Sequence, residues 1–235
     1  MRTDPAGLEL WSTPAGEYWA PAGNVGHLFV LAELQTEPYN NELASVKRGD
    51  VVIDCGAYLG HFTSAALAAG AARVIAVEPG SKQVSCLRRT FAAEIAEGKV
   101  TVVTEGVWDS EGQLEFRDDG TPDARFTAAN PNGGKADITA AVPVTTIDAI
   151  VRRLGLTAVD FIKMDIEGAE QHALRGAAQT LARFKPRLAI AAYHKSEDPA
   201  GIPKVTRAAN PGYRMVSEGC RLDVGEIRPL TFFFY

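Results

Sequence analysis

Short apolar runs alternate with stretches of helical periodicity between residues 51 and 103. A run followed by apolar residues at i, i+3, i+4 and i+7 indicates a buried strand and then an amphipathic helix. The pattern predicts strands at Val51–Ile53, Val74–Val77 and Val100–Val103, a helix from His61 with the stripe Phe62, Ala65, Ala66 and Ala69, and a helix through Val84, Leu87, Phe91 and Ile95. Such alternation is typical of an α/β fold, with a mainly parallel sheet covered by helices on both faces.

The pattern changes after Val103. Residues 111–116 predict an extra strand, and residues 117–138 are rich in Gly, Pro, Asp and Asn, which predicts a long surface loop. Loops of this length inside compact domains are often functional lids or disordered segments. We interpret 117–138 as a lid on the substrate side.

Regular elements return in the second half of the chain. A strand at 138–146 leads to a helix from Ile147, for which Thr146 is the expected cap. Further strands are predicted at Val159–Met164, Leu188–Ala192, Tyr213–Val216 and Thr231–Phe234, with a helix after Gly168. The last two strands can pair as a hairpin, which would place one antiparallel strand in an otherwise parallel sheet.

Residues 1–48 follow neither pattern. Aromatic residues, among them Trp11 and Trp19, lie between prolines there without strand alternation. We interpret 1–48 as a cap segment and 49–235 as one domain, since 235 residues suffice for one substantial core. Trp11 and Trp19 either line an acceptor pocket or anchor the cap on the sheet.

Composition narrows the classes of partner. The chain is 46% hydrophobic and 23% charged, with a formal net charge of -5. Nucleic acid is disfavoured as a substrate, because proteins that bind its backbone normally carry a positive patch. The chain starts without the apolar core of a signal peptide and has no apolar stretch near the ~20 residues that span a bilayer, so we expect a cytoplasmic protein without membrane contact. The three cysteines are widely spaced, which indicates neither a disulfide framework nor a zinc site.

A glycine turn follows the strand Val51–Ile53. Asp54, Gly56 and Gly60 form a D-x-G-x-x-x-G sequence, which differs from the G-x-G-x-x-G of dinucleotide sites. Glycines allow close approach of a ligand, and the next helix offers unpaired amides, so Gly56, Ala57, Tyr58 and Gly60 are predicted ligand contacts. The carboxylate of Asp54 would repel a pyrophosphate but suits ammonium, sulfonium and hydroxyl groups. S-adenosylmethionine is such a ligand.

A second acidic residue supports the same ligand. Glu78 ends the strand Val74–Val77, about 20 residues after the glycine turn, where doubly wound nucleotide-binding folds place an acid on the ribose hydroxyls. Glu78 and the adjacent Pro79 are therefore predicted cofactor contacts.

Several motifs in a fixed order resemble those of the FkbM-type methyltransferases. They are GDVVIDCGAYLG at 49–60, VEP at 77–79, GVWD at 106–109, the T-x-D helix start at 146–148 and KMDIEGAE at 163–170. The resemblance covers Gly49 to the carboxyl terminus and implies a Rossmann-like class I methyltransferase fold, with a seven-stranded sheet containing one antiparallel strand. It also implies S-adenosylmethionine as methyl donor and O-methylation of sugars or natural products. Cys55 and Tyr58 depart from the pattern, in which smaller or amide-bearing residues are common.

Acidic residues follow the strand Val159–Met164. We expect Asp165 in the crevice beside the sulfonium, where it can bind the cofactor's amino group, the acceptor or a metal; the alternative is a helix cap. Glu167 is a further catalytic candidate that points into the cleft, whereas Glu170 is interpreted as structural. Lys163 is expected to pair with a carboxylate, because a buried charge is expensive.

His194 follows the strand Leu188–Ala192 and is predicted to reach the same crevice as Asp165. A histidine of near-neutral pKa there is a candidate general base, which can contribute about 10²- to 10⁴-fold; the alternative is a structural hydrogen bond. Asp165, Glu167 and His194 also form a candidate set of ligands for a divalent metal, although no compact spacing supports it. Tyr193 is predicted to contact the substrate.

Two other segments are expected near the ligands. Glu105, Gly106 and Val107 are predicted to contact the adenine, chiefly through the backbone of Gly106 and Val107. In the cap segment, Glu37 and Tyr39 are predicted to contact the acceptor or the methionine end of the cofactor.

The sequence therefore predicts an S-adenosylmethionine-dependent methyltransferase that acts on a hydroxyl of a small molecule, sugar or natural product. N-methylation of a small amine and a nucleoside-binding module without catalysis are the alternatives. An NAD-dependent oxidoreductase is a third, against which the missing second glycine counts. The sequence predicts neither the acceptor nor the oligomeric state.

Overall fold

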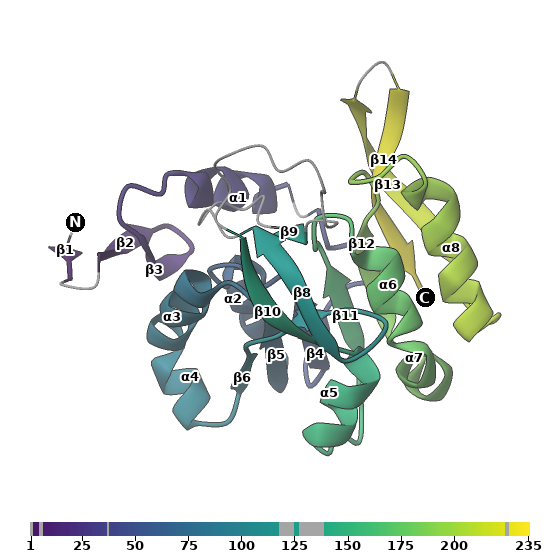
Figure 1. Ribbon diagram of the computed structural model, residues 1–235, viewed down its shortest axis with the longest axis horizontal. Coiled ribbons are helices and arrows are strands. Elements are labelled where there is room, and N and C mark those ends of the chain that lie inside the picture. Colours follow the sequence, from purple (N-terminus) through teal and green to yellow (C-terminus); the bar gives the residue numbers. More distant parts are fainter. Residues whose placement is uncertain (1, 5–6, 37, 118–124, 127–138, 224–225) are drawn as a thin grey trace.

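The computed structural model describes residues 2–4, 7–36, 38–117, 125–126, 139–223 and 226–235. Seven of the strands within these ranges form one sheet in the order β13-β14-β12-β11-β4-β5-β6 (Figure 1). Their bounds are β4 Val51–Cys55, β5 Arg73–Val77, β6 Val100–Val103, β11 Phe161–Met164, β12 Arg187–Ala191, β13 Met215–Asp223 and β14 Glu226–Phe234. Strand β14 is antiparallel to both neighbours and the other neighbouring pairs are parallel, which confirms the predicted fold class and the closing hairpin.

The central strands separate two hydrophobic layers, because successive residues of a strand point to opposite faces. Val52 and Phe161 belong to one layer, and Ile53 and Ile162 belong to the other. The first face is covered by α2 (His61–Ala68), α3 (Ser81–Thr90) and α4 (Ala92–Ala96). The second is covered by α5 (Ile147–Arg153), α6 (Glu170–Arg175), α7 (Ala178–Phe184) and α8 (Asp198–Ala209). The Thr146 hydroxyl caps α5 as predicted, accepting from the Ala149 amide at 3.0 Å.

Two details of the predicted helices on the first face are wrong. In α2, Phe62 and Ala66 are buried but Ala65 and Ala69 are exposed, and Thr63 is buried instead. With its Thr63 side facing the sheet, the helix lets the Thr63 hydroxyl donate a hydrogen bond to the buried carboxylate of Asp54, near the end of β4. The helix predicted through residues 84–95 is split at Phe91, whose backbone leaves the helical region at φ -106° and ψ 28°.

Helix α8 was not predicted. Its sequence contains Pro199, Gly201 and Pro203, all of which usually interrupt helices. Pro199 lies in the first turn, where a missing amide costs nothing, and Ile202 and Thr206 supply the buried face. Packing against α6 and α7 therefore outweighs the poor local propensity.

The segment before residue 49 contains a sheet that the sequence pattern did not predict. Strands β1 (Arg2–Thr3), β2 (Leu8–Thr13) and β3 (Gly16–Pro21) pair antiparallel, and α1 (Gly26–Leu34) follows. The inward positions of β3 are Tyr18 and Ala20, so a small residue hides the alternation. Strand β3 packs on α3, where the Trp19 amide donates to the Thr90 hydroxyl at 3.0 Å and Arg89 lies over the Trp19 ring. The division at residue 48 remains a prediction.

A smaller sheet lies beside the carboxyl ends of the central strands (Figure 1). It has the order β7-β10-β8-β9, with β7 Gly106–Val107, β8 Gly112–Arg117, β9 Arg125–Phe126 and β10 Thr139–Thr145. Strands β8 and β10 confirm the two strands predicted around the long loop. Apart from Arg117, Arg125 and Phe126, the lid predicted at 117–138 lies outside the described residues. None of the helices in the described ranges is long and apolar enough to cross a bilayer.

Candidate functional site

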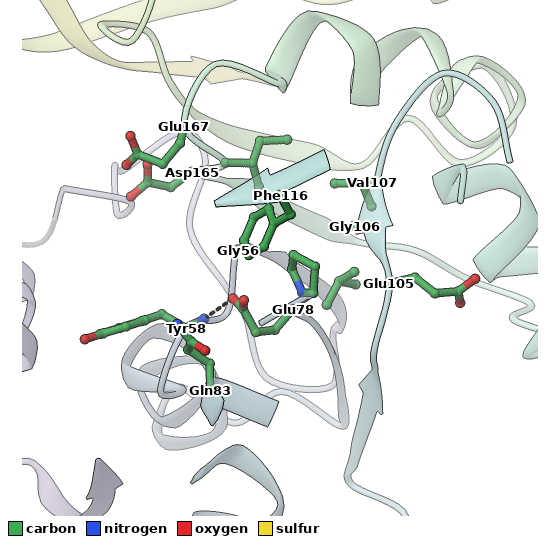
Figure 2. Close-up of a pocket in the computed structure, with 13 residues that line it drawn as sticks. Gly56, Tyr58, Glu78, Gln83, Glu105, Gly106, Val107, Phe116, Asp165 and Glu167 are labelled. Atoms are coloured by element: carbon green, nitrogen blue, oxygen red, sulfur yellow. Dashed lines mark hydrogen bonds between the residues drawn. The ribbon is translucent and has the colours of Figure 1, made fainter. Parts of the chain in front are cut away.

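A cleft opens where the strand order reverses between β4 and β11, at the carboxyl ends of the strands. Ligands of open α/β sheets bind at this kind of switch point. We call it the strand-end cleft (Figure 2). Most of the predicted contacts line it, namely Gly56, Tyr58, Glu78, Pro79, Glu105, Gly106, Val107, Asp165 and Glu167.

Gly56 brings its backbone against the turn after β11. Its φ is +75°, and a Cβ added there would lie 2.0 Å from the Asp165 carbonyl oxygen. Its amide donates to the Val77 carbonyl at 3.0 Å, which joins the ends of β4 and β5. Only glycine fits this close approach, which leaves the backbone open to the cleft. Gly60, at φ +89°, serves packing instead: an added Cβ would lie 2.2 Å from the Phe91 ring.

Asp54 lies under the turn. Its side chain is fully buried, accepts the Thr63 hydroxyl at 2.7 Å and lies 3.4 Å from Lys163 Nζ, its partner in the β4–β11 register. It lines neither the strand-end cleft nor the second cleft described below, so this position does not support the predicted direct contact with a ligand. Its charge instead stabilises the turn.

Lys163 pairs with a carboxylate as expected and also holds the turn. Its ammonium donates to the carbonyls of Cys55 and Gly56, at 3.3 and 2.8 Å. Burial opposes its charge, but Asp54 and Asp165 outweigh burial and raise the pKa of Lys163. The lysine is therefore a permanent cation that fixes the carbonyls of the glycine turn.

Glu78 is held in the cleft by two backbone amides. One carboxylate oxygen accepts from the Tyr58 amide at 2.9 Å (Figure 2). The other accepts from the Gly80 amide at 2.8 Å. The side chain is only 6% exposed, so its orientation is fixed. Each carboxylate oxygen can accept more than one hydrogen bond, so Glu78 can still accept from ligand hydroxyls.

Some cleft residues could not be found by motif reading. The lining is completed by Val77, Gln83, Phe116 and Ile166, of which Phe116 comes from the extra strand β8.

The carboxylate of Glu105 points away from the other labelled side chains in Figure 2 and pairs with Arg153.

A second cleft, the adjoining cleft, continues from the first towards α1. It measures about 450 Å³ and contains the predicted residues Ala57, Tyr39 and Tyr193. Gly56, Tyr58, Asp165 and Glu167 line both clefts and so mark the junction between them. Glu37 lies outside the described residues.

Backbone strain is concentrated at this junction. Tyr58 (φ 51°) and Glu167 (φ 53°) are two of the three non-glycine residues with positive φ in the described ranges. Such conformations cost about 1–3 kcal/mol and gather at functional sites, where the surrounding structure enforces them.

Four ionisable side chains meet behind the junction. His194 Nδ1 lies 2.9 Å from Glu170 Oε1, and its Nε2 lies 3.3 Å from both Asp165 Oδ1 and Glu167 Oε1. Glu170 is completely buried, and the side chains of Asp165 and Glu167 are 25% and 20% exposed. The structure thus brings together all three predicted catalytic residues.

The near-neutral pKa expected for His194 does not fit this arrangement, and its role as a base remains a prediction. Burial alone would lower the pKa of His194, but hydrogen bonds to Glu167 and Glu170 and the charges of Glu170 and Asp165 raise it to about 11. At neutral pH His194 already holds a proton, so it cannot accept another.

Tyr39 connects the segment before residue 49 to this cluster. Its hydroxyl donates to Asp165 Oδ2 at 2.6 Å. Burial, together with the charge of Asp165, raises the pKa of Tyr39 well above its usual value, so the phenol remains a donor.

Residues 54–215 match the family model of the methyltransferase FkbM domain, which is more than half of the chain. The chain belongs to the FkbM methyltransferase domain family. The family model describes a methyltransferase domain, and this FkbM domain matches it from the end of β4 to the start of β13. No curated protein sequence matches the chain.

Solved structures agree on the fold. Methyltransferase FkbM from Methylobacillus flagellatus KT is 25% identical with a TM-score of 0.56, and the match covers 80% of this chain but 44% of that one. Trm5b from Pyrococcus abyssi is 11% identical with a TM-score of 0.52, and the match covers 98% of this chain and 56% of that one. SMU.776, a putative methyltransferase complexed with SAH, is 13% identical with a TM-score of 0.51, and the match covers 99% of this chain and 57% of that one. The chain therefore spans about half the length of these proteins.

Proposed function

We propose that this chain transfers a methyl group from S-adenosylmethionine to a hydroxyl of a small molecule, sugar or natural product. The observation that carries the proposal is the junction of two clefts at Gly56, Tyr58, Asp165 and Glu167. The donor would occupy the strand-end cleft and the acceptor the adjoining cleft, so the reacting groups would meet at the junction.

The residues of the strand-end cleft fit the donor. Glu78 would accept from the ribose hydroxyls, the apolar groups of Val107, Phe116 and Ile166 would contact the adenine, and the Gly56 backbone would lie against the amino-acid end. When bound, S-adenosylmethionine supplies a methyl group activated by a sulfonium. The chain itself must orient the acceptor, exclude water and remove a proton.

Carboxylates at the junction are the proton acceptors that this chain offers. Asp165 and Glu167 line both clefts, whereas His194 is already protonated and stabilises them as anions. A positioned base contributes about 10²- to 10⁴-fold, and correct orientation of the reactants can contribute roughly 7–11 kcal/mol. Orientation of the reactants by the two clefts is therefore expected to contribute more to the rate than the base does.

The adjoining cleft favours a neutral or cationic acceptor with an apolar part. Glu33, Asp165 and Glu167 make it acidic, Val30 and Phe62 give it apolar walls, and Lys163 is paired with Asp54. Its volume lies within the range of small-molecule pockets, about 300–1,000 Å³. Phosphorylated acceptors and nucleic acid are disfavoured by the acidic lining. A small amine remains the alternative acceptor, since the same charges would attract it.

Calorimetry with S-adenosylmethionine, its demethylated product and NAD tests the donor. The first two should bind and NAD should not. Glu78→Gln should weaken binding by about tenfold or more, because a charged acceptor of hydrogen bonds is lost. Glu105→Gln is the matched control, since this glutamate lines the same cleft but pairs with Arg153. Selective binding of NAD would contradict the proposal.

Transfer of labelled methyl groups to a panel of hydroxylated and amino acceptors tests the reaction. Turnover of hydroxylated acceptors, abolished by Asp165→Asn with donor binding retained, would support it. Turnover of amines alone would favour N-methylation, and donor binding without turnover on the whole panel would favour a nucleoside-binding module.

A further inference from the structure

The cluster behind the junction has the composition of a cation site. Asp165, Glu170 and His194 each offer a ligand atom, and these atoms lie within 4.8 Å of one another. They come from the ends of β11 and β12 and the start of α6, so the sheet itself brings them together. Glu167 adds a third carboxylate 3.3 Å from the imidazole.

Polar atoms in this cluster lack hydrogen-bond partners. Asp165 Oδ1 and Glu170 Oε2 are shielded from solvent and accept no hydrogen bond from the described residues. The side chain of His194 is only 7% exposed and its Nε2 is directed at the acids. Buried polar atoms without partners are rare and cost free energy, which indicates a missing ligand.

The distances fit a cation better than direct hydrogen bonds. Nε2 lies 3.3 Å from both Asp165 Oδ1 and Glu167 Oε1, which exceeds the roughly 2.7–2.9 Å of a charge-assisted hydrogen bond. Adjacent ligands of an octahedral cation, each about 2.1 Å from it, are about 3 Å apart. His194 Nε2 is thus spaced from each of these two carboxylates like a neighbouring ligand.

Glu170 supplies the orientation that such a histidine needs. Its Oε1 lies 2.9 Å from His194 Nδ1 and also accepts the Ile166 amide at 3.0 Å. Histidines that bind metals usually donate their other ring N–H to a carboxylate, which leaves the second nitrogen as the ligand. Glu170 is a positioning residue in this arrangement.

We infer that Asp165, Glu167 and His194 bind a divalent cation such as Mg²⁺ or Mn²⁺, with Glu170 orienting the histidine. The cation takes the place of the proton that His194 Nε2 holds in the metal-free chain, and that proton is released to solvent. Three carboxylates surround one imidazole, so the cluster carries excess negative charge that a divalent cation offsets. Oxygen-rich sites with one imidazole suit these ions. Because Asp165 and Glu167 line both clefts, the cation would contact an acceptor hydroxyl at the junction. That last step rests on the proposed function; binding of the cation does not.

Titration of the full chain with Mn²⁺, followed by electron paramagnetic resonance of the free ion, tests the site without donor or acceptor. One Mn²⁺ per chain is expected, displaced by excess Mg²⁺. Asp165→Asn and Glu167→Gln should each weaken binding by at least about tenfold. His172→Gln is the matched control, because His172 also pairs with an aspartate, Asp109, at 2.6 Å but away from the clefts. Its affinity should equal that of the wild type.

The wild-type titration makes the inference falsifiable even if a variant does not fold. The side chains of Asp165 and Glu167 are 25% and 20% exposed, so neither substitution replaces a fully buried residue, and thermal unfolding checks each protein. Failure of the wild type to bind Mn²⁺ would overturn the inference, as would unchanged affinity in folded Glu167→Gln and Asp165→Asn. Donor binding by calorimetry is measured separately, so loss of the cation site is distinguished from failure of the proposed function.

Discussion

Two glycines with the same backbone angle have different surroundings in this chain. Gly56 and Gly98 both have φ +75°, but a Cβ on Gly56 would meet the Asp165 carbonyl oxygen at 2.0 Å, whereas nothing lies within 4 Å of one on Gly98. The pair therefore separates the cost of the backbone conformation from the cost of the close approach.

Gly98→Ala should lower the free energy of unfolding by about 1–2 kcal/mol, the usual cost of a left-handed alanine. Gly56→Ala should lower it further and abolish binding of S-adenosylmethionine, because the turn must move away from β11. Urea unfolding and calorimetry measure the two effects. Equal losses of stability, or donor binding retained in Gly56→Ala, would contradict this account of the turn.

Single residues could be predicted where their signal is local. Gly56 and Glu78 follow directly from the strand–turn–helix pattern and lie in the strand-end cleft. The role of Asp54 could not be predicted, because it depends on the register that places Lys163 opposite it. The protonation of His194 likewise depends on carboxylates brought together only by the fold.

Whole elements were predictable where apolar periodicity is strong. The strands of the large sheet and helices α2 and α5 have this signal. Strands β1 to β3 and helix α8 lack this signal. A small residue obscures the alternation of β3, and prolines obscure the periodicity of α8, so packing against neighbouring elements decides that these segments form. The extra strand β8 was predicted, but not its position beside the cleft, which depends on pairing with β10.

Strand β8 gives an element-scale prediction. Phe116 faces the cleft and is 3% exposed, while its neighbour Glu115 is exposed on the other face of the strand. Phe116→Leu keeps an apolar wall but removes the aromatic face, which is worth about 0.5–1.5 kcal/mol. Affinity for S-adenosylmethionine should fall by about threefold to tenfold, with stability changed by less than about 1.5 kcal/mol.

Glu115→Ala on the same strand is the control and should bind the donor like the wild type. Calorimetry and thermal unfolding of both variants provide the comparison. If Phe116→Leu bound the donor unchanged, the smaller sheet would not form a wall of the donor site.

At the scale of the molecule, the segment before residue 49 is joined to the sheet by buried polar side chains. Tyr39 donates to Asp165, and His27 of α1 stacks on His61 of α2 with ring centroids 5.9 Å apart. Both histidines are buried, and none of their ring nitrogens has a hydrogen-bond partner among the described residues. The contact between α1 and α2 therefore favours the neutral form of both histidines.

This contact makes the stability of the chain sensitive to mild acid. Burial, with smaller contributions from the charges of His27 and Lys163, lowers the pKa of His61 from 6.5 to about 3. Burial lowers the pKa of His27 as well. Between pH 6.5 and 3 the unfolded chain binds a proton at His61 that the folded chain does not, so stability falls as the pH falls. The slope from His61 is about 1.4 kcal/mol per pH unit well below pH 6.5.

Urea unfolding of the wild type and of His61→Phe at pH 7, 6, 5 and 4.5 tests this. The variant keeps an aromatic ring between Tyr18 and Tyr58 but cannot bind the proton, so it should lose less stability than the wild type below pH 6.5. The difference between the two curves should grow to about 2 kcal/mol by pH 4.5, since the full slope develops only below pH 6. Any offset at pH 7 reflects packing and does not affect the comparison. If the two stability curves ran parallel, His61 would bind its proton equally well in the folded and unfolded chains, and α1 would not shield it from water.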